Sequence, residues 1–247
     1  MSQFQVKILR YATLPSTNSE AASLALAGAA EGQCVVADEQ TAGRGRLLRQ
    51  WISPKDAGLY FSVLLRPSLP PERWPLISLM AALAVQSALA NVAHLETDIK
   101  WPNDLLANGK KISGILVESV ETKSGRAIVL GIGINLRSAA LAPELIDIAT
   151  SVESVTGRRV DREVVLIALL DALKTYYSKL QAIGGEEVVI KDWSARSSYA
   201  AGKRIRVSNG DEVIEGVTQG LEPDGALRLK ADDGQMRIIR AGDVWCS

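Results

Sequence analysis

The chain has 247 residues, 47% of them hydrophobic, which is typical of a folded protein with a sizeable core. Lys plus Arg and Asp plus Glu both number 28, so the net charge provides no field to attract nucleic acid or an anionic membrane. The two cysteines lie far apart in sequence, and the N-terminal residues lack the apolar run of a signal peptide. We therefore expect a cytoplasmic protein that binds neither nucleic acid nor membrane.

Hydrophobic periodicity and turn residues predict the order of the first elements. A helix is expected to begin at Ser16 or Thr17, with Glu20 completing a capping box, and to end at Gly28. Further strands are expected at 34–39, 59–65, 97–101, 112–120 and 127–136, and further helices at 74–95, 161–181 and 186–194. Residues 121–125 are expected to form a hairpin loop. Although 74–95 carries no Asp, Glu, Lys or Arg, Pro75 and the polar residues of its second half favour a buried helix over a membrane span.

The pattern changes near residue 200, where short alternating segments are separated by turn dipeptides. These dipeptides are Asn209-Gly210, Asp224-Gly225 and Asp233-Gly234, each typical of a β-hairpin. We expect a catalytic domain over residues 1–198 and a small SH3-like β-barrel over residues 199–247. The predicted fold class is α/β (α+β), with a mixed, largely antiparallel sheet backed by helices. The barrel has either a role in positioning ligands or a packing role only.

The stretch Gly43-Arg44-Gly45-Arg46, followed by Arg49 and Trp51, carries the clearest chemical signal. Arginine binds phosphate and carboxylate through a planar fork of donors and stacks on flat rings. Glycine allows a ligand to approach the backbone closely. The combination suits a nucleotide, whereas the alternative interpretation is a solvated basic turn.

Several common kinds of catalytic site are excluded by composition and spacing. His94 is the only histidine, which removes Ser-His-Asp, Cys-His and His-rich metal sites together. There is no Walker sequence and no strand-linked dinucleotide fingerprint, so no redox cofactor is expected. Gly131-Ile132-Gly133 lies inside a predicted strand and indicates a close approach of a ligand or another strand.

Three further polar clusters are candidates for the same site. Ser16-Thr17-Asn18 offers hydroxyls and backbone N–H groups at a helix start, either for a polar heterocycle or simply for helix capping. Lys100-Trp101-Pro102-Asn103-Asp104 places a carboxylate and an amide on one turn. Lys110-Lys111-Ile112-Ser113-Gly114 leads into a strand, where alternation directs one lysine into a site and its neighbour toward water.

Together these clusters resemble the biotin protein ligase family, the biotin–[acetyl-CoA-carboxylase] ligases. The matching stretches are Ser-Thr-Asn at 16–18, Gln-x-x-Gly-Arg-Gly-Arg at 40–46 with Trp51, Lys-Trp-Pro-Asn-Asp-Leu at 100–105, Lys-Ile-Ser-Gly-Ile-Leu-Val-Glu at 111–118 and Gly-Ile-Gly-Ile-Asn-Leu at 131–136. The resemblance covers most of residues 13–136 and includes a small C-terminal β domain. It implies that ATP activates biotin as biotinyl-5′-adenylate, which then acylates one lysine of a biotin carboxyl carrier protein. Such chemistry needs positioning and charge neutralisation but no protein nucleophile.

The resemblance also implies a role for individual residues. Biotin binding is expected to involve Ser16, Thr17, Asn18, Gln40, Gly43, Arg44, Arg46, Lys111 and Gly114. ATP and adenylate binding is expected to involve Arg46, Arg49, Trp51, Asn103, Asp104, Lys111 and Asn135, with Trp51 and Asn135 contacting the adenine. Arg44, Lys111 and Asp104 are the expected catalytic residues, and Asp104 either holds Mg²⁺ with the phosphates or orients the incoming amine.

One departure and several alternatives accompany this interpretation. The family loop has a glycine where this chain has Leu48, which we expect to form part of a lid over the adenylate. A lipoate ligase or octanoyl transferase shares the fold, but lipoate lacks the ureido ring. A DNA-binding regulator is disfavoured because the first motif begins at residue 16, and an inactive binding module because Arg44, Asp104 and Lys111 are present. An apolar-rich sheet edge could support a homodimer, and the sequence does not decide the oligomeric state.

Overall fold

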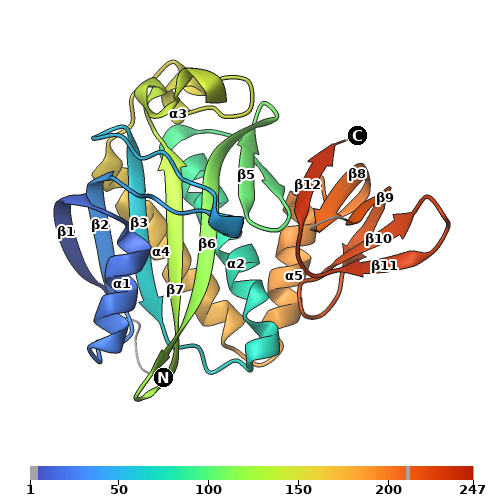
Figure 1. Cartoon of the computed structure of the whole chain (residues 1–247), viewed down its shortest axis with the longest axis horizontal. Helices are drawn as coiled ribbons and strands as arrows, with labels where there is room; N and C mark the ends of the chain where they lie inside the picture. The colour runs from blue at the N-terminus through green and yellow to red at the C-terminus, as the bar shows by residue number, and fades with distance from the viewer. Residues whose placement is uncertain (1–4, 210–211, 247) are drawn as a thin grey trace.

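A seven-stranded sheet forms the main body of the chain, whose residues 5–209 and 212–246 are described by the computed structural model (Figure 1). The strand order is β1-β2-β3-β7-β6-β5-β4, with β1 parallel to β2 and the other neighbours antiparallel. The strands are β1 Lys7–Leu14, β2 Gln33–Gln40, β3 Gly58–Leu65, β4 Asp98–Lys100, β5 Asp104–Ala107, β6 Lys110–Thr122 and β7 Gly125–Asn135. The predicted mixed, largely antiparallel sheet is confirmed.

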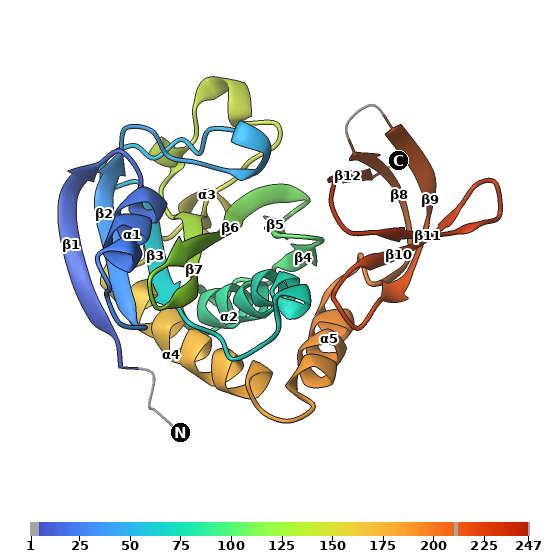
Figure 2. The ribbon, with the colours of Figure 1, turned by 60° about the horizontal axis from the view of Figure 1, so that its bottom comes forward.

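Helices cover the two faces of this sheet unequally (Figure 2). The helices are α1 Thr17–Leu26, α2 Pro75–Ala93, α3 Val152–Thr156, α4 Arg162–Leu180 and α5 Gly185–Arg196. Helix α1 packs alone on one face against β2, β3, β6 and β7, whereas α2, α4 and α5 pack together behind the other face. The site described below therefore opens beside α1, on the face that the longer helices leave uncovered.

Local sequence explains the boundaries of the two longest helices. Helix α4 begins where the Asp161 carboxylate accepts hydrogen bonds from the backbone N–H groups of Glu163 and Val164, as an N-cap does. Helix α2 has Pro75 in its first turn and ends at His94, which adopts a left-handed conformation. Although α2 is long and apolar enough to cross a membrane, it packs against α4, α5 and the sheet as a core helix.

Several details differ from the predicted elements. Ser16 occupies the N-cap position of α1, but its side chain makes no capping bond, and Glu20 instead accepts a hydrogen bond from Tyr11. Strands β6 and β7 extend into residues 121–125, so their connection is tighter than expected because the ladder continues to the Thr122–Gly125 pair. The predictions omitted β5, α3 and a last short strand, all of them too short to produce a periodic signal. The predicted turn at Asn209-Gly210 falls outside the described residues.

A second, five-stranded antiparallel sheet follows the main body, with the order β11-β10-β9-β8-β12. Its strands are β8 Ala201–Asn209, β9 Glu212–Leu221, β10 Leu227–Ala231, β11 Met236–Ile239 and β12 Asp243–Cys246. This C-terminal sheet is attached to the main body where the Trp101 indole N–H donates to the Gly225 carbonyl over 3.0 Å and Arg73 donates to the Pro223 carbonyl. The attachment brings β12 to the edge of the site.

Candidate ligand-binding site

A cavity of about 130 Å³ lies over the pocket face of β6 and β7. It is bounded by the start of α1, the Gly/Arg loop, the turn before β5 and the first residue of β12. Of the residues proposed from sequence, it is lined by Ser16, Thr17, Asn18, Gln40, Arg44, Arg46, Arg49, Trp51, Asn103, Asp104, Lys111 and Gly114. Four segments far apart in the sequence thus meet at one pocket, and Arg44 and Lys111 share it.

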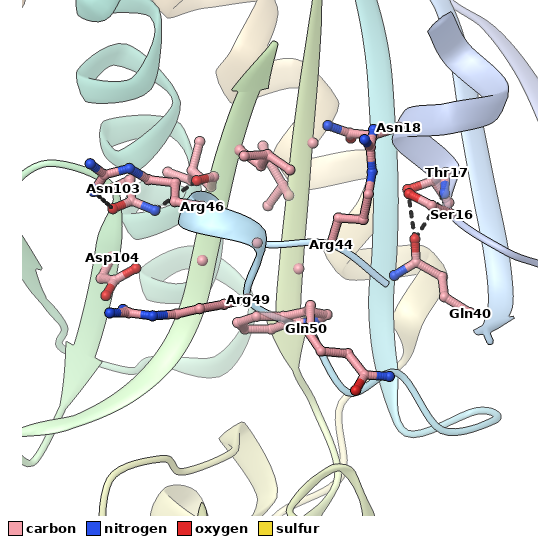
Figure 3. A pocket seen from close by; sticks show the side chains of 18 of the residues that line it. Ser16, Thr17, Asn18, Gln40, Arg44, Arg46, Arg49, Gln50, Asn103 and Asp104 are labelled. Atoms are coloured by element: carbon pink, nitrogen blue, oxygen red, sulfur yellow. Dashed lines mark hydrogen bonds between the residues drawn. The ribbon is translucent and has the colours of Figure 1, made fainter. Parts of the chain in front are cut away.

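The polar groups fall into two ends of the pocket (Figure 3). We define the neutral end by Ser16, Thr17, Asn18 and Gln40, and the charged end by Arg46, Arg49, Asn103, Asp104 and Lys111. The Arg44 side chain lies between the two ends and extends toward Asn18. An elongated ligand with a polar neutral head and an anionic tail matches this arrangement.

Hydrogen bonds hold the neutral end in place. Gln40 Oε1 accepts from the Thr17 backbone N–H over 2.8 Å and from the Thr17 hydroxyl over 3.1 Å, while Gln40 Nε2 donates to Ser53 Oγ over 2.7 Å. Ser16, Thr17 and Asn18 are each less than 5% exposed. Because buried polar groups cost free energy when unpaired, this end is fixed before any ligand arrives.

The floor of the pocket depends on three glycines. A Cβ on Gly131 would lie 2.0 Å from Asn18 Oδ1, and a Cβ on Gly133 would lie 2.5 Å from the Trp51 indole. A Cβ on Gly114 would lie 2.9 Å from the same ring and 3.1 Å from Lys111 Cε. The predicted close approach at Gly131-Ile132-Gly133 is therefore made by Asn18 and Trp51, side chains of the protein itself.

The Trp51 ring packs against Gly114 and Gly133, on the floor of the pocket. The Lys111 ammonium is 5.4 Å from the centroid of its ring, within the range of a cation–π contact. Its indole Nε1 is buried and has no hydrogen-bond partner.

Each cation of the pocket is held by an oxygen of the protein. Lys111 Nζ lies 2.6 Å from Asp104 Oδ1, Arg44 Nη2 donates to Glu118 Oε2 over 2.7 Å, and Arg46 Nη1 donates to Asn103 Oδ1 over 3.1 Å. Both terminal nitrogens of Arg49 bind the Asp243 carboxylate on β12. An anionic ligand therefore replaces or joins protein oxygens that already bind these side chains, and three of the four partners are carboxylates.

Arg46 is a partly buried cation of the pocket. Burial lowers the pKa of Arg46, and the carboxylates of Asp243 and Asp104 act in the opposite direction. Its guanidinium remains protonated because arginine titrates far above neutral pH. A charge in such a partly dry environment acts more strongly on a ligand anion than the same charge in water.

The Gly/Arg loop is a short hairpin with an unusual turn. Trp51 N donates to the Gly43 carbonyl over 2.9 Å, and Arg49 N donates to the Arg46 carbonyl over 3.1 Å. The central residues Leu47 and Leu48 have φ of 54° and 61°, as in a type I′ turn, a conformation that leucine rarely adopts. Leu48 is fully exposed and lines an outer groove, outside the cavity.

Two of the proposed residues do not line the cavity. Asn135 is buried at the end of β7, on the same face as Gly131 and Gly133 but outside the cavity, and its Nδ2 donates to the Thr150 carbonyl over 3.0 Å. Gly43 is the first residue of the Gly/Arg loop, and a Cβ there would lie 2.3 Å from the Trp51 carbonyl oxygen. Conversely, the proposals omitted the carboxylates of Glu118 and Asp243. Glu118 ends a motif identified in the sequence, whereas no sequence signal indicated Asp243.

Asp104 is the only residue proposed as a metal ligand. It follows the cis peptide bond between Trp101 and Pro102 and pairs with Lys111. Within residues 5–209 and 212–246 there is no group of three or more His, Cys, Asp or Glu side chains that could hold a metal ion. A single carboxylate of this kind fits a hydrated Mg²⁺ that arrives bound to phosphates, not a cage of protein ligands.

The fold and the site define a class of protein. Residues 11–135 match the Biotin/lipoate A/B protein ligase family, and residues 201–245 match the Biotin protein ligase C terminal domain. The chain belongs to this family. It is 37% identical over 237 residues to a biotin–[acetyl-CoA-carboxylase] ligase of Paracoccus denitrificans, covering 93% of this chain and 96% of that one. It is also 37% identical over 237 residues to the bifunctional ligase/repressor BirA of Bacillus subtilis, covering 95% and 72%.

A solved structure agrees with these relatives. The biotin protein ligase of Aquifex aeolicus in complex with biotin and ATP superposes with a TM-score of 0.86 at 28% identity, covering 98% of this chain and 99% of that one. The predicted resemblance to biotin protein ligases is therefore confirmed.

Proposed function

We propose that this protein is an ATP-dependent biotin–protein ligase. It activates biotin as biotinyl-5′-adenylate and transfers the biotinyl group to a lysine of an acceptor protein, a carboxylase carrier subunit. The observation that supports this most directly is a single pocket with a neutral hydrogen-bonding end and a cationic end. That pocket belongs to a chain similar over its whole length to a ligase that binds biotin and ATP.

The neutral end suits the ureido ring of biotin. A ureido group presents one carbonyl acceptor and two N–H donors, which need hydroxyls, amides and backbone groups as partners. Thr17, Ser16 and Gln40 supply groups of this kind at the start of α1. Lipoate has no such ring, and a lipoate ligase would gain little from this network.

The charged end suits the meeting of two anions. The biotin carboxylate must approach the α-phosphate of ATP, and its oxygen attacks phosphorus while the bond to pyrophosphate breaks. Arg44, Arg46 and Lys111 are the cations that would reduce the repulsion and stabilise charge on phosphorus and on the departing pyrophosphate. Arg49 and Trp51 would contact the nucleotide.

The second step forms an amide bond. The amine of the acceptor lysine attacks the acyl carbon of the mixed anhydride, the carbon–oxygen bond breaks, and AMP leaves with the electron pair. The attacking amine releases a proton to solvent, and Asp104 is the carboxylate of the pocket that would orient the amine. Bound Mg²⁺ would neutralise phosphate charge in the first step. Asp104 is the residue that would hold the ion against the nucleotide.

Other properties follow as proposals of the same function. The acceptor is a biotin carboxyl carrier protein, in line with the names of the relatives. A cytoplasmic location and the absence of nucleic-acid or membrane partners remain predictions, as does a homodimer. Asn135 lies outside the cavity with its Nδ2 bonded to the Thr150 carbonyl, so contact with the adenine would require that side chain to move.

Incubation of the purified chain with biotin, MgATP and a biotin carboxyl carrier domain tests the proposal. We expect a covalent mass increase of one biotinyl group on the carrier, measured by mass spectrometry, and release of pyrophosphate. A parallel incubation with lipoate should leave the carrier unmodified. Modification by lipoate with no reaction of biotin would assign the chain to the other branch of the family.

A further inference from the structure

Glu118 has no part in the function as proposed so far. It is the last residue of the motif at 111–118 and lies on the pocket face of β6, the same face as Gly114 and Leu116. Its Oε2 accepts two hydrogen bonds, one from Arg44 Nη2 and one from Asn18 Nδ2, each 2.7 Å long. One carboxylate oxygen thus joins the loop arginine to the start of α1.

The position of Glu118 follows from the register of the floor. Leu116 pairs with Gly131, and Glu118 pairs with Val129, the next position on the same face. Because Gly131 has no side chain, the Asn18 amide lies directly over it. The next acceptor along the strand is the Glu118 carboxylate, which accepts a hydrogen bond from the Asn18 amide.

The contact with Glu118 fixes the orientation of the Asn18 amide. Since Nδ2 donates to the carboxylate, Oδ1 must face the Ser62 hydroxyl, which lies 2.6 Å away. The same hydroxyl lies 2.7 Å from Thr17 Oγ1, and Thr17 contacts Gln40. Hydrogen-bonded contacts therefore connect Arg44 to the neutral end through Glu118.

The protons of this network do not suffice for all of its contacts. Ser62 has one hydroxyl proton, which serves either Asn18 or Thr17 but not both. With the Asn18 orientation fixed by Glu118, the proton of Ser62 goes to Asn18 Oδ1, and the Thr17 proton goes to Gln40 Oε1 or to Ser62 Oγ. In both cases the Thr17 oxygen keeps a lone pair that can accept from another donor. An N–H of a ligand is a suitable donor for that oxygen.

We propose that Glu118 is a positioning residue for adenylate formation. It holds the Arg44 guanidinium between the two ends of the pocket and, through Asn18, sets which group Thr17 presents to the ligand. Only one guanidinium nitrogen is committed to Glu118, so the remaining donors are available to the carboxylate and α-phosphate. The inference rests on the ligase function proposed above.

A purely structural role explains the arrangement less well. The Arg44 side chain is 44% exposed and Glu118 is 32% exposed, and ion pairs of this exposure contribute little to folding stability. Fixing a catalytic cation in the geometry of attack, in contrast, affects the rate strongly. The contact therefore matters for the turnover number more than for the fold.

Glu118→Gln tests the role of the charge, because glutamine retains an acceptor for Asn18 but holds Arg44 without an ion pair. We expect kcat for biotin-dependent pyrophosphate release to fall about tenfold, with KM for biotin and the melting temperature nearly unchanged. Glu121→Gln is the matched control. Glu121 lies on the same strand and pairs with Arg126 away from the pocket, so its variant should retain the parent rate.

A double-mutant cycle with Arg44→Ala tests whether Glu118 affects kcat through its contact with Arg44. If Glu118 acts through Arg44, Glu118→Gln should cost about tenfold in the parent and less than about twofold in the Arg44→Ala background. Equal losses in both backgrounds, or an unchanged kcat in the single variant, would overturn the inference. Failure of the proposed function has a different signature, since the parent protein would then release no pyrophosphate with biotin.

Discussion

The neutral and charged ends of the pocket hold their polar groups in different ways. At the neutral end, Ser16, Thr17 and Asn18 are almost entirely buried, and the polar groups of Thr17 and Asn18 are hydrogen-bonded to Gln40 and Glu118. At the charged end, Lys111 is 33% exposed and Arg49 is 60% exposed, and each is paired with a carboxylate. Neutral groups in a dry site must be satisfied in advance, whereas a charge can rest on an internal carboxylate until the ligand anion arrives.

The difference predicts different kinetic signatures. Loss of a group at the neutral end should weaken binding of biotin, which makes the same contacts before and during reaction. Loss of a group at the charged end should lower the rate of reaction, because charge develops there in the transition state. Of the four variants below, which begin with the largest expected effect, Lys111→Ala and Thr17→Val separate the two ends, and the other two test the floor and the Gly/Arg loop.

Lys111→Ala should lower the rate of adenylate formation by a factor of about 100 or more, as expected for loss of a charged contact in the transition state. The variant also leaves Asp104 without its partner. Pyrophosphate release measures the rate. Lys110→Ala is the control, since Lys110 donates instead to the Ile146 carbonyl. Near-normal release by Lys111→Ala would remove this lysine from the mechanism.

Gly133→Ala should destabilise the protein by about 1–3 kcal/mol, because the added methyl meets the Trp51 indole and overpacks the floor shared by both ends. Chemical denaturation with a global probe measures the loss. Gly45→Ala is the control: its added Cβ would lie 3.4 Å from the nearest atom, the Arg49 carbonyl oxygen. Because this is an ordinary van der Waals contact, the variant should retain its stability. Equal stabilities for the two variants would contradict the position of the indole.

Thr17→Val should raise KM for biotin about tenfold while leaving KM for ATP unchanged, because it removes one hydroxyl of the neutral end and preserves the side-chain shape. Gln40 retains its bond from the Thr17 backbone N–H. Steady-state assays with each substrate varied in turn distinguish the two constants. Thr13→Val, outside the pocket, serves as the control; an equal effect on both constants would place Thr17 elsewhere in the reaction.

Leu48→Gly should stabilise the protein by about 1 kcal/mol. Leucine in the left-handed region costs about 1–2 kcal/mol, and glycine removes this cost but also increases the conformational entropy of the unfolded chain, which offsets part of the gain. The midpoint of urea unfolding measures the change. The same variant tests the predicted lid, for which release of the adenylate should accelerate. An unchanged release rate would exclude Leu48 from any lid.

The sequence was sufficient to predict most elements and most of the proposed residues that line the pocket. Period-2 and helical patterns located β2, β3, α2 and α4 to within a few residues, because long segments with one buried face carry a strong signal. The Ser-Thr-Asn, Gly/Arg and Lys-Ile-Ser-Gly motifs were expected in one pocket, and their residues line it. Short elements such as β5 and β12 could not be predicted from the sequence pattern, because their formation depends on pairing with other strands.

Contacts between distant segments were not predictable. Asp243 lies 194 residues from Arg49, and Glu118 lies 74 residues from Arg44 and 100 from Asn18. The selection of Trp51 as the partner of Gly114 and Gly133 depends on where the Gly/Arg loop folds back onto the sheet. Nothing local in the sequence specifies these pairs, since ion pairs and close packing depend on separation in space.

The amino-acid sequence by itself determined which chemistry is available: hydroxyls and amides for a neutral head, and arginine and lysine for an anionic tail, with no histidine or cysteine nucleophile. Only the tertiary structure decided how that chemistry is held at rest, by placing a carboxylate or amide oxygen beside each cation and an indole on a glycine floor. Side-chain type fixes what a group can do in any environment. Its pairing, exposure and neighbours arise only when strands and loops from opposite parts of the chain pack together.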